Sequence, residues 1–317
     1  TPAPFNASVF LFGAISLGGL VGLMSPATGA TLSRGIDTTL LLMIFLLFFE
    51  LRLSSLFNAV QHIRFLALAW SANFLLIPII GLCIASLFFS NQPILFAGLM
   101  IYFLAPCTDW FLGFTRLAKG DTELGATLIP VTLITQLLLF PSWLWLFANG
   151  TGLADLSSMS SILLQWFLAP MIAAQGMRFA AARLLPTQQR DAVMSWMSRC
   201  LTFVLAALIF QIFATHIGDI VRQLDVAALV AVAVLFYFIV TFAVGEVLSR
   251  LGRLKYPQRA LLSMTMAARN GPLMLALCAI AIPNQPLALA VIVAAMLVEI
   301  PLLTALNQIL LRLRPER

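Results

Sequence analysis

Charge is scarce in this chain. Only 9% of its 317 residues are Asp, Glu, Lys or Arg, whereas 62% are hydrophobic and the mean hydropathy is +1.03. Apolar runs this long and frequent exceed what a soluble core of this size accommodates, so the composition predicts an all-α polytopic membrane protein. The net charge of +6 does not indicate a nucleic-acid partner, because the basic residues lie in short loops and form no basic face.

Cysteine is sparse, and the motifs of several enzyme classes are missing. The four cysteines, Cys83, Cys107, Cys200 and Cys278, lie far apart without CxxC spacing, which argues against a disulfide framework or a zinc site. No GxxxxGK[ST] run is present, which excludes a nucleotide-driven pump within this chain. An intramembrane enzyme would need a catalytic pair at matching depth, and no motif supports Asp109 with Glu299 in that role. We therefore expect a non-enzyme without a cofactor.

Ten apolar segments are long enough to cross a bilayer. Their approximate limits are 8–26, 36–54, 64–90, 94–118, 122–148, 158–182, 192–215, 225–250, 258–282 and 285–312. The first segment could be mistaken for a signal peptide, but it lacks a basic start, and ten spans give a consistent charge pattern. Connections are short, so we expect a single transporter domain over 1–317.

Basic residues concentrate on one side of these spans. The loops after the even-numbered spans and the tail hold fourteen of them, against two, Arg34 and Arg222, on the other side. The fourteen are Arg52, Arg64, Arg116, Lys119, Arg178, Arg183, Arg190, Arg250, Arg253, Lys255, Arg259, Arg312, Arg314 and Arg317. By the positive-inside rule, this predicts cytoplasmic termini, in what we expect to be a bacterial inner (plasma) membrane.

Two spans are interrupted near the middle of the membrane. Leu104-Ala105-Pro106-Cys107-Thr108-Asp109-Trp110 breaks the fourth span, and Arg269-Asn270-Gly271-Pro272 breaks the ninth. Paired broken helices are a pointer to the substrate site of a secondary transporter. An offset of five spans predicts two inverted repeats, about 8–148 and 158–312.

The residues around these breaks resemble a known family. Ala105-Pro106-Cys107-Thr108 followed by Leu117-Ala118-Lys119-Gly120-Asp121 is similar to the fourth helix of the bile acid:sodium symporter superfamily, in its arsenite efflux permease branch. Val298-Glu299-Ile300-Pro301 resembles the tenth-helix element of that branch, and Ala72 to Pro78 a third-helix element of the superfamily. Thr265 and Asn270 match polar positions of the ninth helix.

This resemblance implies a fold and a set of site residues. The expected fold has a panel part (helices 1, 2, 6 and 7) and a core part (helices 3–5 and 8–10), in which broken helices 4 and 9 cross at the substrate site. The residues expected to bind substrate are Cys107, Thr108, Arg269, Asn270 and Glu299. As(III) is thiophilic, so Cys107 is its expected ligand, and Glu299 could carry an exchanged proton.

The chain departs from the family pattern at two charged positions. Asp109 stands at a position that is small and neutral in the arsenite branch, and Arg269 stands at one that is Asn there or Gln in the sodium-coupled branch. Thr265 replaces a sodium-ligating Glu of that second branch. A guanidinium would repel sodium, so we expect Asp109 and Arg269 to pair and supply a built-in cation. The expected coupling residues are Asp109, Glu299, Arg269, Thr265 and Asn73.

Structural interpretations compete with these functional ones. Asp109 with Arg269 could be only a structural lock, and Cys107 a packing residue. Asn73 and Thr132 could line a cavity, or either could instead cap its own helix backbone. Glu50 and Glu246 are expected to snorkel or to pair with Arg52 and Arg250.

Two transport functions remain open at this point. One is gradient-driven, proton-coupled efflux of arsenite or a similar small oxyacid. The other is sodium- or proton-coupled transport of a small organic anion, favoured by Arg269. The oligomeric state is left open.

Overall fold

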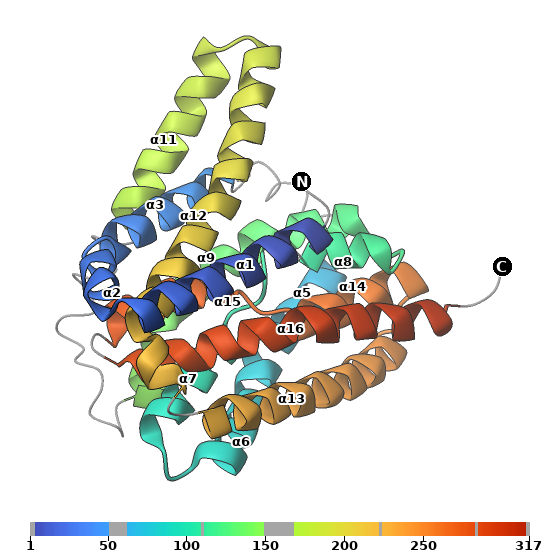
Figure 1. The fold of residues 1–317 in the computed structure, drawn as a ribbon. Coiled ribbons are helices and arrows are strands. Elements are labelled where there is room, and N and C mark those ends of the chain that lie inside the picture. Colours follow the sequence, from blue (N-terminus) through green and yellow to red (C-terminus); the bar gives the residue numbers. More distant parts are fainter. Residues whose placement is uncertain are drawn as a thin grey trace. The chain divides into compact units, whose positions relative to one another are not determined.

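The computed structural model of this chain describes residues 4–50, 62–108, 111–148, 168–221, 224–282 and 285–314, and these residues are almost entirely helical (Figure 1). The chain divides into two compact units. Unit 1 comprises Thr1–Leu51 with Asp155–Gln223, and unit 2 comprises Arg52–Ala154 with Leu224–Arg317. The all-helical class predicted from composition is confirmed.

Four helical segments within the described residues are long and apolar enough to cross a membrane by themselves. They are Ile63–Phe89, Thr187–Thr215, Asp225–Leu251 and Pro286–Arg312, and the pair Ala27–Ser33 and Ile36–Glu50, bent by 45°, could form a fifth span. The predicted number of ten spans exceeds this count and stays a prediction. Several predicted limits nevertheless lie within a few residues of observed helix ends.

Unit 1 is built from α1 (Pro4–Met24), α2 (Pro26–Ser33), α3 (Ile36–Glu50), α11 (Ala169–Leu184) and α12 (Thr187–Val221). Helix α1 packs along α12 at a close distance that only glycine permits. A Cβ atom on Gly18 would lie 2.5 Å from the Phe210 carbonyl oxygen, and one on Gly22 would lie 2.4 Å from the Ala214 carbonyl oxygen. Such small-residue contacts are a common way for membrane helices to associate.

Unit 2 contains the remaining described elements. They are α5 (Ile63–Ser71), η3 (Ala72–Leu76), α6 (Ile77–Phe89), α7 (Pro93–Leu104), α8 (Phe111–Leu117), α9 (Thr122–Ala148), α13 (Leu224–Leu251), α14 (Tyr256–Ala267), α15 (Gly271–Ala281) and α16 (Pro286–Arg312). Proline lies in the first turn of α7, α14, α15 and α16. Its missing N–H costs nothing there, which explains why these helices begin where they do.

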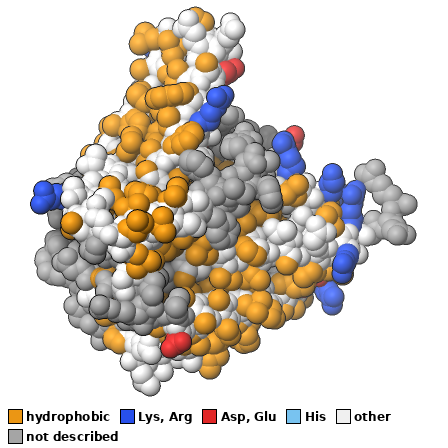
Figure 2. Space-filling model, viewed as in Figure 1, with side chains coloured by type: hydrophobic (Ala, Val, Ile, Leu, Met, Phe, Trp, Pro, Cys, Tyr) orange, Lys and Arg blue, Asp and Glu red, His pale blue; other side chains and the backbone are white. Residues whose placement is uncertain are grey.

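The outer surface of unit 2 is largely apolar, with basic side chains at one end. Figure 2 shows hydrophobic side chains over the face of α13 and α16, and Lys and Arg side chains at the end of this unit where both helices finish. The exposed large apolar residues of α13 are Val232, Leu235, Phe236, Ile239, Val247 and Leu251. An apolar flank with a basic end is typical of a helix bundle in lipid.

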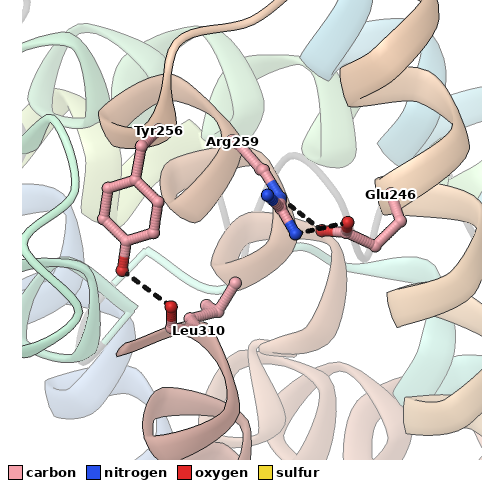
Figure 3. A network of polar contacts seen from close by, with 4 residues as sticks. All are labelled: Glu246, Tyr256, Arg259 and Leu310. Carbon is pink, nitrogen blue, oxygen red and sulfur yellow. Dashed lines mark hydrogen bonds and ion pairs between the residues drawn. The ribbon is translucent and has the colours of Figure 1, made fainter. Parts of the chain in front are cut away.

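At the basic end of unit 2, hydrogen bonds and an ion pair connect neighbouring helices (Figure 3). The Tyr256 hydroxyl lies 2.8 Å from the Ala118 carbonyl oxygen and 3.0 Å from the Leu310 carbonyl oxygen, so it joins the ends of α8 and α16 to the start of α14. Arg259 donates to Glu246 through Nε at 2.6 Å and through Nη2 at 2.5 Å.

The partner that we predicted for Glu246 differs from the one in the structure. We expected Arg250, four residues along the same helix, but that side chain is exposed and the bidentate partner is Arg259. The short connection between α13 and α14 turns the chain back on itself, which places the start of α14 beside the last turns of α13. The partner for Glu50 that we expected, Arg52, lies outside the described residues.

The turn between α8 and α9 depends on two adjacent residues. Lys119, not the following glycine, has the left-handed backbone conformation, with φ of 58°. Gly120 is needed for space, because a Cβ atom there would lie 2.7 Å from Cγ2 of Thr115.

Candidate functional site

The two predicted breaks are present in unit 2, and they meet. Helix α7 ends at Leu104, and α14 ends at Ala267. Pro106 and Arg269 then pair as an isolated antiparallel bridge. Its hydrogen bonds run from Asn270 N–H to the Ala105 carbonyl at 2.9 Å and from Cys107 N–H to the Ala268 carbonyl at 3.1 Å. The backbone groups freed by one break are therefore partly satisfied by the other, as a low-dielectric environment requires.

The bridge brings four predicted site residues together. Cys107 and Arg269 are fully buried beside it, at 2% and 0% exposure. The Asn270 side chain donates from Nδ2 to the Thr108 hydroxyl at 3.0 Å. Its Oδ1 accepts from Leu273 N–H at 3.2 Å, so the same amide caps the start of α15 and reaches across to the other break.

Glu299 lies against this crossing from the middle of α16. Thirteen residues of the helix precede it (286–298) and thirteen follow (300–312), which puts it about 20 Å from either end. The carboxylate is fully buried. It accepts from Arg269 N–H at 2.9 Å and from the Tyr102 hydroxyl at 2.7 Å. A buried carboxylate at this depth is costly unless bonded in this way.

Neutral oxygens surround the guanidinium of Arg269. Nη2 lies 2.9 Å from Asn73 Oδ1, 2.6 Å from the Thr265 carbonyl oxygen and 3.0 Å from the Met266 carbonyl oxygen. Nη1 donates to the Phe103 carbonyl at 3.3 Å. Nε has no hydrogen-bond partner among the residues that the structure describes. We name the four oxygens of Asn73, Phe103, Thr265 and Met266 the oxygen cage.

Asn73 reaches the cage from an irregular turn. It lies in η3, a π-helical turn between α5 and α6, and Pro78 follows two residues after that turn. Proline cannot donate to the carbonyl four residues earlier, so a local widening of the helix is expected just before it. Asn73 Nδ2 bonds the Ala69 carbonyl at 2.9 Å and approaches Thr265 Oγ1 at 3.4 Å. Asn73 therefore both bonds its own helix, as one interpretation expected, and contacts the site.

Two other sequence-based interpretations have different outcomes. Thr132 bonds the Leu128 and Ile129 carbonyls of its own helix, at 3.0 and 2.9 Å, as the capping interpretation expected. Asp109 lies outside the described residues, so its pairing with Arg269 stays a prediction.

Sequence reasoning missed three polar residues of unit 2. Tyr102 bonds Glu299, and the Tyr237 hydroxyl bonds the Met266 carbonyl at 2.7 Å while its ring lies 5.9 Å from the Arg269 guanidinium carbon. Gln136 is 1% exposed, and neither amide atom has a hydrogen-bond partner among the described residues. The chain has only three tyrosines, and two of them lie inside apolar runs, which is a signal that could have singled them out.

The site thus combines a thiol, a carboxylate, a permanent cation and amide groups near mid-membrane depth. No group of three or more His, Cys, Asp or Glu that could hold a metal ion occurs among the described residues. The arrangement suits a small polar solute held by one thiol and by hydrogen bonds, rather than a multidentate metal centre.

Two comparisons with known proteins bear on this site. A family model described as the Sodium Bile acid symporter family matches residues 38–220. The chain is also 25% identical to the arsenical-resistance protein Acr3 of Corynebacterium glutamicum over 281 residues, which cover 84% of this chain and 75% of that protein. The matched region includes the whole of the first helix break.

Proposed function

This chain belongs to the Sodium Bile acid symporter family, and from that premise we propose that it is a secondary transporter that exports arsenite, or a similar small trivalent oxyacid, by proton-coupled alternating access. In this proposal, ten spans form two inverted repeats in a bacterial inner membrane with both termini in the cytoplasm. Unit 1 serves as the panel and unit 2 as the core that carries the solute. The similarity to an arsenical-resistance protein supports the choice of solute and the outward direction.

One observation carries the proposal: the two helix breaks meet in a single bridge beside a buried thiol. Cys107 donates its N–H to the other break, so the position of its Cα is fixed by the crossing. Asn270 and Thr108 lie beside it as hydrogen-bonding groups. A solute held here would lie where the half-helices of a transporter present polar groups at mid-membrane depth.

Cys107 supplies the chemistry that selects trivalent arsenic. Arsenous acid, As(OH)₃, is neutral at physiological pH, and its soft As(III) centre prefers sulfur. The Cys107 thiol replaces one hydroxyl: an S–As bond forms, an As–O bond breaks, and the thiol proton leaves with the hydroxide as water. Hydrolysis of the S–As bond on the other side of the membrane reverses the step. A single thiol gives a ligand that can be released, whereas three thiols would trap the solute.

Glu299 is the proposed proton carrier. It is the carboxylate nearest the bridge among the described residues, because it bonds the backbone of Arg269 directly. When ionised, it balances the charge of Arg269 within the same buried region. Protonation would leave the charge of Arg269 without a carboxylate counter-charge among the described residues of this buried region, so a change in the protonation state of Glu299 is expected to alter the relative stability of the two access states.

Arsenite flux into everted membrane vesicles tests this function. Everted vesicles with the wild-type protein are expected to accumulate arsenite in response to a proton gradient, and Cys107→Ala is expected to abolish that flux. Cys278→Ala is the matched control, since Cys278 is a fully buried thiol of α15 outside the bridge. Equal arsenite flux in the Cys107→Ala and wild-type proteins would contradict the proposal.

The buried guanidinium of Arg269 favours a second candidate, transport of a small organic anion. Its Nε–H is a donor without a partner among the described residues, and a carboxylate could accept from it. Counterflow of radiolabelled carboxylates at varied pH and sodium concentration distinguishes the two functions. Carboxylate flux without arsenite flux would favour this second candidate.

A further inference from the structure

We propose that the Arg269 guanidinium permanently fills a site that is built for a free monovalent cation, and that removing this side chain opens the site to Na⁺ or to free guanidinium. The inference concerns cation binding alone and does not depend on which solute is transported. It rests on the oxygen cage, whose four members come from η3, α7 and α14 of one unit.

The cage exists because the helices break. The carbonyls of Phe103, Thr265 and Met266 would normally accept from the N–H groups four residues later in their own helices. At the crossing those three N–H groups have other acceptors: Cys107 bonds the Ala268 carbonyl, Asn270 the Ala105 carbonyl and Arg269 the Glu299 carboxylate. Three buried carbonyls therefore lose their helical donors, and the Arg269 guanidinium donates to all three, while the Met266 carbonyl also accepts from the Tyr237 hydroxyl at 2.7 Å.

The C-terminal ends of α7 and α14 both lie at the oxygen cage. Phe103 lies in the last turn of α7, and Thr265 and Met266 lie in the last turn of α14. The C-terminal end of a helix carries partial negative charge, which favours a cation. Unwound carbonyls and half-helix C-termini are the groups that coordinate coupling cations in transporters with broken helices.

The donor set suits a hard monovalent cation. All four members are neutral oxygens, three from carbonyls and one from the Asn73 amide. Rings of carbonyl oxygens replace the hydration shell of alkali ions in membrane proteins. The Glu299 carboxylate accepts a hydrogen bond from the backbone N–H of Arg269, and in its ionised form it balances one positive charge, whether that charge belongs to Arg269 or to a free cation.

A tethered cation also explains how the wild-type protein would exclude a free one. The guanidinium uses Nη1 and Nη2 on every member of the cage, so a second cation would meet a like charge and no available carbonyl. We therefore expect the wild-type protein to be independent of sodium.

Cation binding to the purified protein tests this inference without any solute. Wild-type protein is expected to show no saturable binding of ²²Na⁺ and no change of melting temperature when Na⁺ replaces N-methylglucamine. Arg269→Ala and Arg269→Ser are expected to bind about one Na⁺ per chain, and their melting temperatures are expected to rise with Na⁺ or guanidinium. Arg269→Lys, which keeps a tethered charge, is expected to remain independent of sodium.

Arg199→Ala is the matched control, because the Arg199 guanidinium bonds only a hydroxyl, Ser195 Oγ, at an exposed site among the described residues. It is expected to gain no cation binding. Saturable Na⁺ binding by the wild-type protein would overturn the inference, as would folded Arg269→Ala and Arg269→Ser proteins that bind neither Na⁺ nor guanidinium. Failure to recover these two variants in either cation, while Arg269→Lys folds, would also overturn it, since an added cation should fill the cage.

Discussion

Arg269 and Glu299 are joined through the backbone N–H of one and the carboxylate of the other, at 2.9 Å, while the Arg269 side chain extends to a separate set of oxygens. The two charges therefore occupy one buried region without sharing a bidentate contact. The carboxylate fixes the backbone at the second break, and the guanidinium fixes the carbonyls exposed by both breaks. Because the two side chains have different partners, substitutions of these residues and of their neighbours are expected to have different effects on transport and stability.

Glu299→Gln is expected to remove the proton-gradient dependence of transport. Glutamine keeps the size of the side chain and an oxygen that can accept from Arg269 N–H, but it cannot exchange a proton. The measurement is vesicle flux with and without a pH gradient. Glu246→Gln, which changes the carboxylate bonded to Arg259 outside the site, serves as the control. A Glu299→Gln protein that still responds to the gradient would exclude Glu299 as the proton carrier.

Tyr102→Phe is expected to lower the free energy of unfolding by about 1.5–3 kcal/mol, because it removes a hydrogen bond to a buried carboxylate. The double variant Tyr102→Phe with Glu299→Gln should show that the two effects are not additive. Denaturation of the four proteins of this cycle in detergent measures the coupling. Additive losses would mean that the tyrosine acts through packing alone.

Gly271→Ala is expected to destabilise the site by about 1–3 kcal/mol through overpacking. A Cβ atom at this position would lie 2.3 Å from Cγ of Met296, on the neighbouring helix α16. Shortening the neighbour should relieve the clash, so Gly271→Ala with Met296→Ala is expected to be less destabilised than the sum of the single variants. Thermal unfolding of the cycle measures this, and a simple sum would show that the close approach of α15 and α16 is not the cause.

Gln136→Leu is expected to raise stability by about 1–3 kcal/mol and to reduce transport. The amide is buried without a hydrogen-bond partner among the described residues, which is costly unless a solute or water meets it during the cycle. Thr132→Val is the control on the same helix, since the Thr132 hydroxyl already bonds its own backbone. Melting temperature and flux are measured together. Unchanged transport in the stabilised Gln136→Leu protein would remove Gln136 from the transport pathway.

Much of this site was predictable because apolar helices make polar interruptions conspicuous. Pro106 and the Gly271-Pro272 pair marked the two breaks, and Cys107, Arg269, Asn270 and Glu299 stood out as polar groups inside apolar runs. The partners of Arg269 were not predictable in the same way. Three of its four acceptors are backbone carbonyls, which every residue carries, so no side-chain pattern points to them.

The sequence by itself determined that this chain is helical, belongs in a membrane and breaks two of its helices, because hydropathy, proline and glycine act locally on the backbone. It also determined the family, because the match to the family model over residues 38–220 depends on the sequence alone. Only the tertiary structure decided that the breaks pair with each other, that Glu299 bonds the backbone of Arg269, and that Glu246 bonds Arg259 rather than Arg250. These choices depend on how helices far apart in sequence pack, and the free energy of a buried polar group is set by whichever partner that packing brings within hydrogen-bonding distance.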